Sequence, residues 1–159
     1  MSRRSTTHKF TSHSSDWILA LLFVDERKPI KGTLRIMKEL FLFRNSGKLP
    51  KDTKIGAFYS FIPYDYGPCS FDIYHDLNLL KKKGDIVALK RPDRRYDVYM
   101  ITDNGAYKAH MFLKRFRPSV LKALFEIKRE FNDLSLYELL SYVYEKYPKY
   151  TRKSVFMQI

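Results

Sequence analysis

The feature that most constrains the fold of this sequence is a helical pattern that stops at a glycine and leads directly into two strand-like runs. Apolar residues recur at helical spacing from the expected cap Ser70 to Lys83, and Gly84 supplies the stop. The runs "DIVALK" and "YDVYMIT" then flank the turn-forming stretch "RPDRR". The pattern predicts a helix followed by a β-hairpin with a basic tip.

Two helices and a short strand are expected before this unit. The first helix runs from Ser15 to about Val24, and Pro29 and Gly32 interrupt the pattern after it. In the second, "TLRIMKELFLF", one face is apolar, with Leu34, Met37, Leu40 and Phe41. The opposite side carries Arg35, Lys38 and Glu39. The stretch "AFYSFIPY" then predicts a strand, closed by a turn over residues 64–68.

Three helices are expected after the hairpin. Thr102 can cap one that runs toward Phe116, and the next starts beyond Pro118. In "LSLYEL", Ser135 and Glu138 have the spacing of a capping box for the last helix.

This order of elements is typical of a winged helix-turn-helix, a mainly α (α+β) fold, with a C-terminal helical extension. We therefore expect a disordered basic tail over residues 1–14 and a winged-helix domain over 15–117. Residues 118–159 are expected to form the helical extension, packed on the same domain.

The charge of the chain favours a polyanionic partner. Thirty Lys and Arg against seventeen acidic residues give a formal net charge of +13, which attracts nucleic acid at long range. The alternative is that the charge serves only solubility. In the tail, Arg3, Arg4 and Lys9 can reach a phosphate backbone, although unbound tails of this composition are also common.

Neither a membrane protein nor an enzyme is indicated. The apolar run "WILALLFV" is far shorter than a membrane span, and a single cysteine, Cys69, fits a reducing cytoplasm. Cys69 and His75 diverge on a helix that begins at Ser70, while Asp72 and Asp76 lack a converging third metal ligand. We expect a non-catalytic protein without a metal or cofactor.

A group of basic residues on two neighbouring elements remains as the candidate binding site. The outer face of the helix that starts at Ser70 carries His75, Asn78 and Lys82, flanked by Lys81 and Lys83. The tip of the hairpin carries Lys90, Arg91, Arg94 and Arg95. In a winged helix the first group can enter the major groove and the second can contact phosphates. The alternative is a solvated helix face and an ordinary charged turn.

A second basic set lies on the helices after the hairpin: Lys114, Arg115, Arg117, Lys122, Lys128 and Arg129. It can widen a nucleic-acid footprint. Alternatively, the helices that carry it can bury an apolar face against a second copy, which would give a homodimer.

The segments "FIPYDYGPCSFDIYHDLNLLKKKGDI", "YMITDNG" and "LSLYELLSYVYEKYPKYTRKS" resemble the YwgA-like proteins, which are related in pattern to the Panacea antitoxin-associated domain. The resemblance covers most of residues 16–154. Its matching residues are Tyr66, Gly67, Pro68, Ser70, Ser135, Tyr137, Glu138, Leu139, Tyr147 and Pro148. Cys69 departs from the aromatic residue common in the family, and the second helix departs from its T-R-L-Q-K pattern. The resemblance implies a compact winged-helix-like domain of prokaryotes and their mobile elements, with no catalytic residues to carry over.

Together these features predict a non-catalytic nucleic-acid-binding protein. Duplex DNA is the favoured ligand, bound by a transcriptional regulator or a DNA-organising factor. An RNA- or ribosome-associated factor and a protein-interaction or antitoxin-like adaptor are the alternatives.

Overall fold

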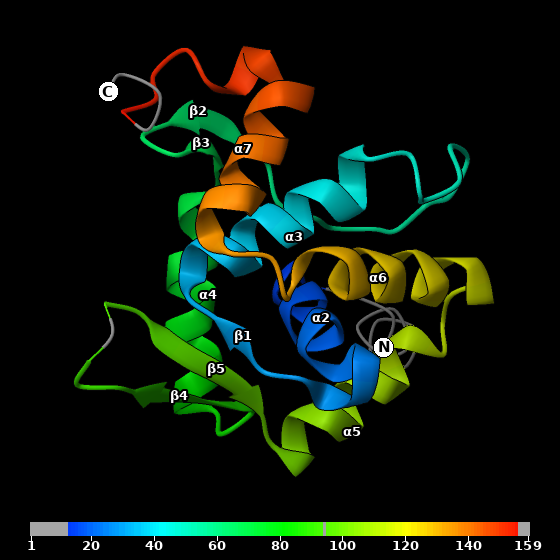
Figure 1. Cartoon of the computed structure of the whole chain (residues 1–159). Helices are drawn as coiled ribbons and strands as arrows, with labels where there is room; N and C mark the ends of the chain where they lie inside the picture. Colours follow the sequence, from blue (N-terminus) through cyan, green and yellow to red (C-terminus); the bar gives the residue numbers. More distant parts are fainter. Residues whose placement is uncertain (1–12, 94, 156–159) are drawn as a thin grey trace, which may run out of the picture.

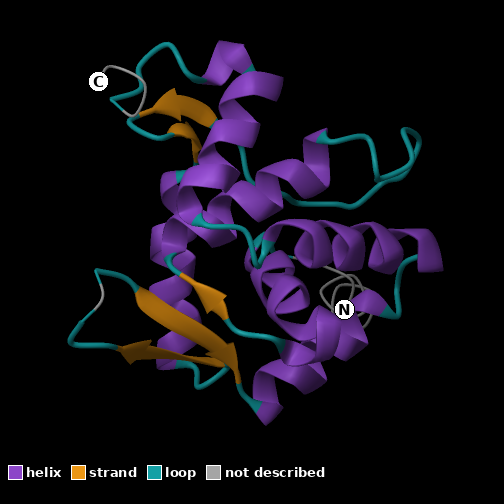
Figure 2. Cartoon of the chain, in the orientation of Figure 1, coloured by secondary structure: helices purple, strands orange, loops and turns teal. Residues whose placement is uncertain are grey.

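The computed structural model describes residues 13–93 and 95–155. The helices are α2 (Ser15–Arg27), α3 (Thr33–Asn45), α4 (Phe71–Lys82), α5 (Asp103–Leu113), α6 (Pro118–Phe131) and α7 (Leu136–Lys146), with a 3₁₀ turn, η1 (Pro148–Tyr150). The strands are β1 (Ile30–Lys31), β2 (Ile62–Tyr64), β3 (Gly67–Cys69), β4 (Ile86–Lys90) and β5 (Asp97–Ile101). The chain is a mixed α+β protein in which helices predominate, as the sequence predicts (Figures 1 and 2).

The strands form two small antiparallel sheets. In the larger, β4 and β5 are the expected hairpin, in register from Ile86 opposite Ile101 to Lys90 opposite Asp97. β1 pairs with the other side of β5, so the strand order is β1-β5-β4. Strand β1 was not predicted from the sequence, because two residues are too few to show an alternating pattern.

The strand predicted over "AFYSFIPY" is shorter than expected, and it belongs to the smaller sheet. Only Ile62–Tyr64 of that stretch is extended, and the expected turn partly straightens into β3, which pairs with it. The hairpin reverses at residues 65 and 66 instead. Cys69 ends β3 and is buried, while Ser70 precedes α4 without a side-chain capping bond.

Helix α3 forms where the sequence predicts it, but its charged side is buried as well as its apolar side. It is covered by α2, α4, α6 and α7 and by the strands β1 and β3. Arg35, Lys38 and Glu39, expected on an exposed side, are therefore buried, at 6%, 1% and 0% exposure. The charged groups are partly compensated, since Arg35 Nη1 donates to Phe131 O at 3.1 Å and Lys38 Nζ to Pro68 O at 2.8 Å.

Lys128, predicted as part of a second basic surface, is also buried. Its helix α6 packs across α2 (Figure 1), and Lys128 Nζ donates to Leu22 O and Val24 O. Those carbonyls lie where α2 loses its helical geometry, at residues 24–26, and Asp25 and Glu26 there both have φ of 58°. The remaining five cations of that set are exposed.

Two local cap predictions are confirmed. The Thr102 hydroxyl accepts from Gly105 N at the start of α5. Ser135 and Glu138 form the reciprocal bonds of a capping box at the start of α7. Both caps involve residues three positions apart, so the local sequence was sufficient to indicate them.

One hydrophobic core joins residues from both sides of position 117, including Trp17, Phe43, Ile127 and Leu139. Trp17 is fully buried, and its ring lies 4.8 Å from that of Phe112, centroid to centroid. Within the described part of the chain, no helix combines the length and apolar character needed to cross a membrane.

Candidate functional site

The outer side of α4 presents the side chains that the sequence singled out. Ile73, Leu77 and Leu80 face the core, so the rest of the helix surface turns outward. The exposed side chains include those of His75, Asn78, Lys81 and Lys82, and of Lys83 just after the helix. These residues are brought together on one element, and the lysines cluster at its C-terminal end.

The first half of α4 is aromatic and acidic rather than basic. Phe71 is 50% exposed and lies between the rings of Tyr64 and Tyr74, with centroid distances of 4.9 and 6.4 Å. Asp76 accepts a bond from the Tyr59 hydroxyl at 2.6 Å. Burial, together with this carboxylate, raises the pKa of Tyr59. The positive potential of α4 is therefore confined to its last turns.

The hairpin tip carries the second part of the predicted site. Lys90, Arg91 and Arg95 are exposed, but Lys90 Nζ lies 3.6 Å from Asp97 Oδ1, and Arg91 Nε lies 3.9 Å from Asp93 Oδ1. Carboxylates thus offset part of the charge of the tip. The other predicted contacts, Arg94 in the tip and Arg3, Arg4 and Lys9 in the tail, lie outside the described residues.

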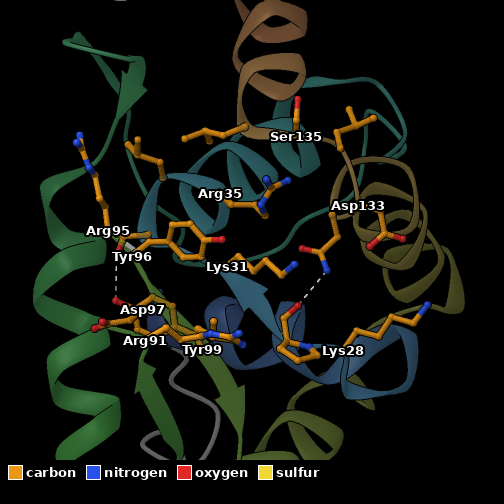
Figure 3. A pocket seen from close by; sticks show the side chains of 18 of the residues that line it. Lys28, Lys31, Arg35, Arg91, Arg95, Tyr96, Asp97, Tyr99, Asp133 and Ser135 are labelled. Carbon is orange, nitrogen blue, oxygen red and sulfur yellow. Dashed lines mark hydrogen bonds between the residues drawn. The ribbon is translucent and has the colours of Figure 1, made fainter. Parts of the chain in front are cut away.

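The side of the hairpin tip borders a cleft of about 1170 Å³ (Figure 3). Its walls come from β1 and the start of α3, from the β4–β5 hairpin and from the segment that joins α6 to α7. The lining residues include Lys28, Lys31, Gly32, Thr33, Leu34, Arg35, Tyr66, Lys90, Arg91, Arg95, Tyr96, Asp97, Val98, Asn132, Asp133, Leu134 and Leu136. Six of these side chains are cationic and two are acidic.

Sequence reasoning missed this cleft and three of its cations, Lys28, Lys31 and Arg35. A partial signal was present, because Gly32 directly before a helix and beside Lys31 marks an uncapped positive helix end. The far walls could not be inferred, since the residues that form them lie more than fifty positions further along the chain.

Cys69 is a free cysteine with a buried side chain. Burial raises the pKa of its thiol, which keeps the nucleophilic thiolate scarce. Over residues 13–93 and 95–155, no group of three or more His, Cys, Asp or Glu side chains is placed to hold a metal ion.

Comparison of the chain with protein families, curated proteins and solved structures finds no match. The resemblance to the YwgA-like proteins therefore stays a prediction that rests on the quoted motifs alone.

Proposed function

We propose that this protein binds nucleic acid without catalysis, in the manner of a winged helix-turn-helix, and that its preferred ligand is duplex DNA. One observation carries the proposal. The elements α2, β1, α3, α4, β4 and β5 occur in this order along the chain, with the β2–β3 hairpin inserted between α3 and α4 and with the sheet order β1-β5-β4. Both α4 and the β4–β5 hairpin carry exposed cations. A helix beside a basic hairpin is the arrangement by which winged helices contact a duplex.

The proposed roles follow from the chemistry of the side chains. His75 and Asn78 can exchange hydrogen bonds with base edges in the major groove. Lys81, Lys82 and Lys83 neutralise phosphates, which gives affinity without sequence preference. On the hairpin, Arg95 extends the contact to a neighbouring phosphate. The lone buried cysteine is consistent with the cytoplasmic location that the proposal includes.

The proposal is tested by a salt titration of binding to random-sequence duplex DNA, followed by fluorescence anisotropy. We expect affinity to fall steeply with salt, because each phosphate contact contributes about 0.9 to the slope of log K against log salt. A triple variant with Lys81, Lys82 and Lys83 replaced by Ala should bind more weakly and with a shallower slope. The absence of binding by the native chain at low salt would refute the proposal.

A matched control removes the same charge elsewhere. Lys51, Lys54 and Lys149 are exposed and lie outside both α4 and the hairpin, so their triple replacement by Ala lowers the net charge equally. We expect this control to keep the native salt slope. Equal losses in both triple variants would mean that net charge, rather than α4, governs binding.

A second candidate, the protein-interaction adaptor, is favoured by the exposed aromatic surface around β2, β3 and the start of α4. Its members are Ile62, Tyr64, Tyr66, Phe71 and Tyr74, each at least 40% exposed. Aromatic side chains in an apolar surface patch are typical of protein interfaces. Co-purification with a stoichiometric protein, free of nucleic acid, would favour this candidate. Stronger binding to structured RNA than to duplex DNA at equal salt would instead favour the RNA-associated factor.

A further inference from the structure

The cleft beside the hairpin contains the uncapped start of a helix. Gly32 occupies the N-cap position of α3 with φ of 92° and provides no side chain to accept from the first amides. A Cβ at this position would lie 3.2 Å from Tyr96 Cβ, so the glycine also lets the hairpin approach α3 closely. Gly32, Thr33 and Leu34 all line the cleft. The first N–H groups of a 13-residue helix and its positive dipole end thus stand at the cleft.

A buried cation supplies an independent indication of an anionic ligand. Arg35 is only 6% exposed and lines the cleft, where it lies in the middle of the labelled side chains in Figure 3. Its Nη1 donates to Phe131 O at 3.1 Å, but its Nε has no hydrogen-bond acceptor among the described residues. Buried donors in proteins almost always have an acceptor. An anion in the cleft would provide one.

The cations around the mouth of the cleft exceed the carboxylates. Lys31 is exposed beside Gly32, and Lys28, Arg91 and Arg95 stand further along the rim. Three of the cations have a carboxylate nearby: Lys90 Nζ lies 3.6 Å from Asp97 Oδ1, Lys28 Nζ lies 3.6 Å from Asp25 Oδ2, and Arg91 Nε lies 3.9 Å from Asp93 Oδ1. The positive charge at the cleft therefore comes mainly from Lys31, Arg35 and Arg95. The surplus of positive charge around one helix N-terminus fits a phosphate group.

The cleft is much larger than a phosphate. Its volume of about 1170 Å³ holds a ligand of nucleotide size, and Tyr66, Tyr96, Leu34 and Leu136 give it aromatic and apolar walls. Asn132 contributes an unpaired acceptor, because its Nδ2 donates to Pro29 O while its Oδ1 has no donor within the described chain. A sugar hydroxyl can donate to that oxygen.

We propose that this cleft binds a nucleotide, with its phosphate at the N-terminus of α3 against Arg35 and Lys31. The base lies toward Tyr96 and Tyr66. This site goes beyond the proposed duplex-binding surface, because Lys31 and Arg35 belong to neither α4 nor the hairpin tip. The nucleotide can be free or can be part of a nucleic-acid chain, and the two sources share the same phosphate chemistry.

The test is calorimetric titration of the full chain at low salt with AMP, with adenosine and with a short single-stranded oligoadenylate. We expect AMP to bind and adenosine to bind at least tenfold more weakly, because charge-assisted bonds to the phosphate supply most of the affinity. If the oligoadenylate binds more tightly than AMP, a nucleotide within a chain is the ligand, and the opposite ranking identifies a free nucleotide. No binding of AMP or oligoadenylate at millimolar concentration, or equal binding of AMP and adenosine, would overturn the proposal.

Substitutions locate the site. Lys31→Glu changes an exposed side chain and should weaken AMP binding by about tenfold or more without affecting folding. Arg35→Ala should weaken AMP binding further, and circular dichroism checks that this buried change leaves the fold intact.

Lys81→Glu on α4 is the matched control and should keep the native AMP affinity. Equal effects of Lys31→Glu and Lys81→Glu would refute the site. Loss of duplex binding with Lys31-dependent AMP binding intact would refute the proposed function alone.

Discussion

Arg35, Lys38 and Lys128 are buried cations, and each donates to main-chain carbonyls of a different segment. Lys38 Nζ donates a hydrogen bond to Pro68 O at 2.8 Å. Lys128 Nζ donates to Leu22 O at 3.2 Å and to Val24 O at 2.9 Å. Burial lowers the pKa of both lysines to about 8. The three side chains therefore link α3 and α6 by hydrogen bonds to the main chain of other segments. Apolar side chains in their place could not make these bonds.

Removing the buried amine of Lys128 should destabilise the protein strongly. Lys128→Ala leaves two carbonyls at the end of the regular part of α2 without their donor and opens a cavity between α2 and α6. We expect the free energy of unfolding to fall by about 3 kcal/mol, measured by urea denaturation. Lys122→Ala, on the exposed side of the same helix, should change it by less than about 0.5 kcal/mol. Similar values for both variants would contradict the structural role assigned to Lys128.

Glu39 should make stability depend on pH. Its side chain is fully buried, neither carboxylate oxygen has a partner among the described residues, and burial raises its pKa from 4.5 to about 8. Between these values the native state holds a proton that the unfolded state has lost. Stability should therefore decrease as pH rises from about 4.5 to 8. The limiting slope is about 1.4 kcal/mol per pH unit.

The variant Glu39→Gln isolates this effect, because it keeps the shape of the protonated acid and cannot ionise. Urea midpoints for the variant should show a flatter profile over pH 4.5–8 than those for the native chain. The two buried lysines act only above pH 8, where their native forms lose protons that unfolded lysines keep. A native profile that rises across the lower window would contradict the assignment to Glu39.

The burial of Arg35, Lys38 and Glu39 could not be predicted from the helical pattern of α3. Periodicity places charged residues opposite the apolar face but does not reveal that other elements cover that side as well. Their carbonyl partners illustrate the difficulty, since Phe131 lies 96 positions from Arg35 and Pro68 lies 30 positions from Lys38. The local signals at Thr102 and Ser135, by contrast, involved neighbours in the sequence and were read correctly.

At the scale of elements, the start of α5 is fixed by close contact with the turn between α4 and β4. Thr102 Oγ1 donates to Gly84 O, and Thr102 N donates to Asp85 O. Gly105, in the first turn of α5, faces the same carbonyl of Asp85 so closely that a Cβ would overlap it. The same Cβ would lie 2.8 Å from Ile101 Cγ1. Helix α5 and the turn at Gly84 and Asp85 therefore lie so close together that only glycine fits at position 105.

Gly105→Ala should therefore destabilise the protein, although the same change in an exposed helix stabilises by about 0.5–1 kcal/mol. Overlap with main-chain atoms that cannot rotate away should lower the free energy of unfolding by about 2 kcal/mol or more. Asn104→Ala, at the exposed neighbouring position, is the control and should be neutral or slightly stabilising. Thermal denaturation of both variants decides the matter, and an increased Tm for Gly105→Ala would contradict the contact.

Strand β1 shows why some elements cannot be predicted locally. Its two residues pair with Tyr99 and Val98 of β5, almost seventy positions away, and Ile30 is buried by that pairing. A strand this short has little stability of its own and forms because β5 offers an open edge. The β4–β5 hairpin was predictable because two longer runs flank one turn.

At the scale of the whole molecule, the cations of the hairpin tip belong to both proposed binding sites. Lys90, Arg91 and Arg95 were predicted from the sequence to accompany α4, and the structure also places them on the rim of the cleft. The α4 surface could be predicted because its residues are consecutive. The cleft could not, because it combines residues from 28–35, 90–99 and 132–136 with Tyr66. If both proposals hold, the two sites share cations.

Shared cations imply that the two ligands oppose each other. AMP in the cleft would offset part of the charge of Arg91 and Arg95 and so weaken their contacts with a duplex. We expect saturating AMP to reduce duplex affinity severalfold at constant ionic strength, with adenosine as the uncharged control. Thermodynamic linkage requires the duplex to reduce AMP affinity by the same factor, which calorimetry in the presence of duplex measures. Lys31→Glu should raise the AMP concentration needed for this effect by about tenfold or more, in line with its weaker AMP binding. Duplex affinity that stays constant as AMP saturates its site would show that the hairpin serves only one of the two surfaces.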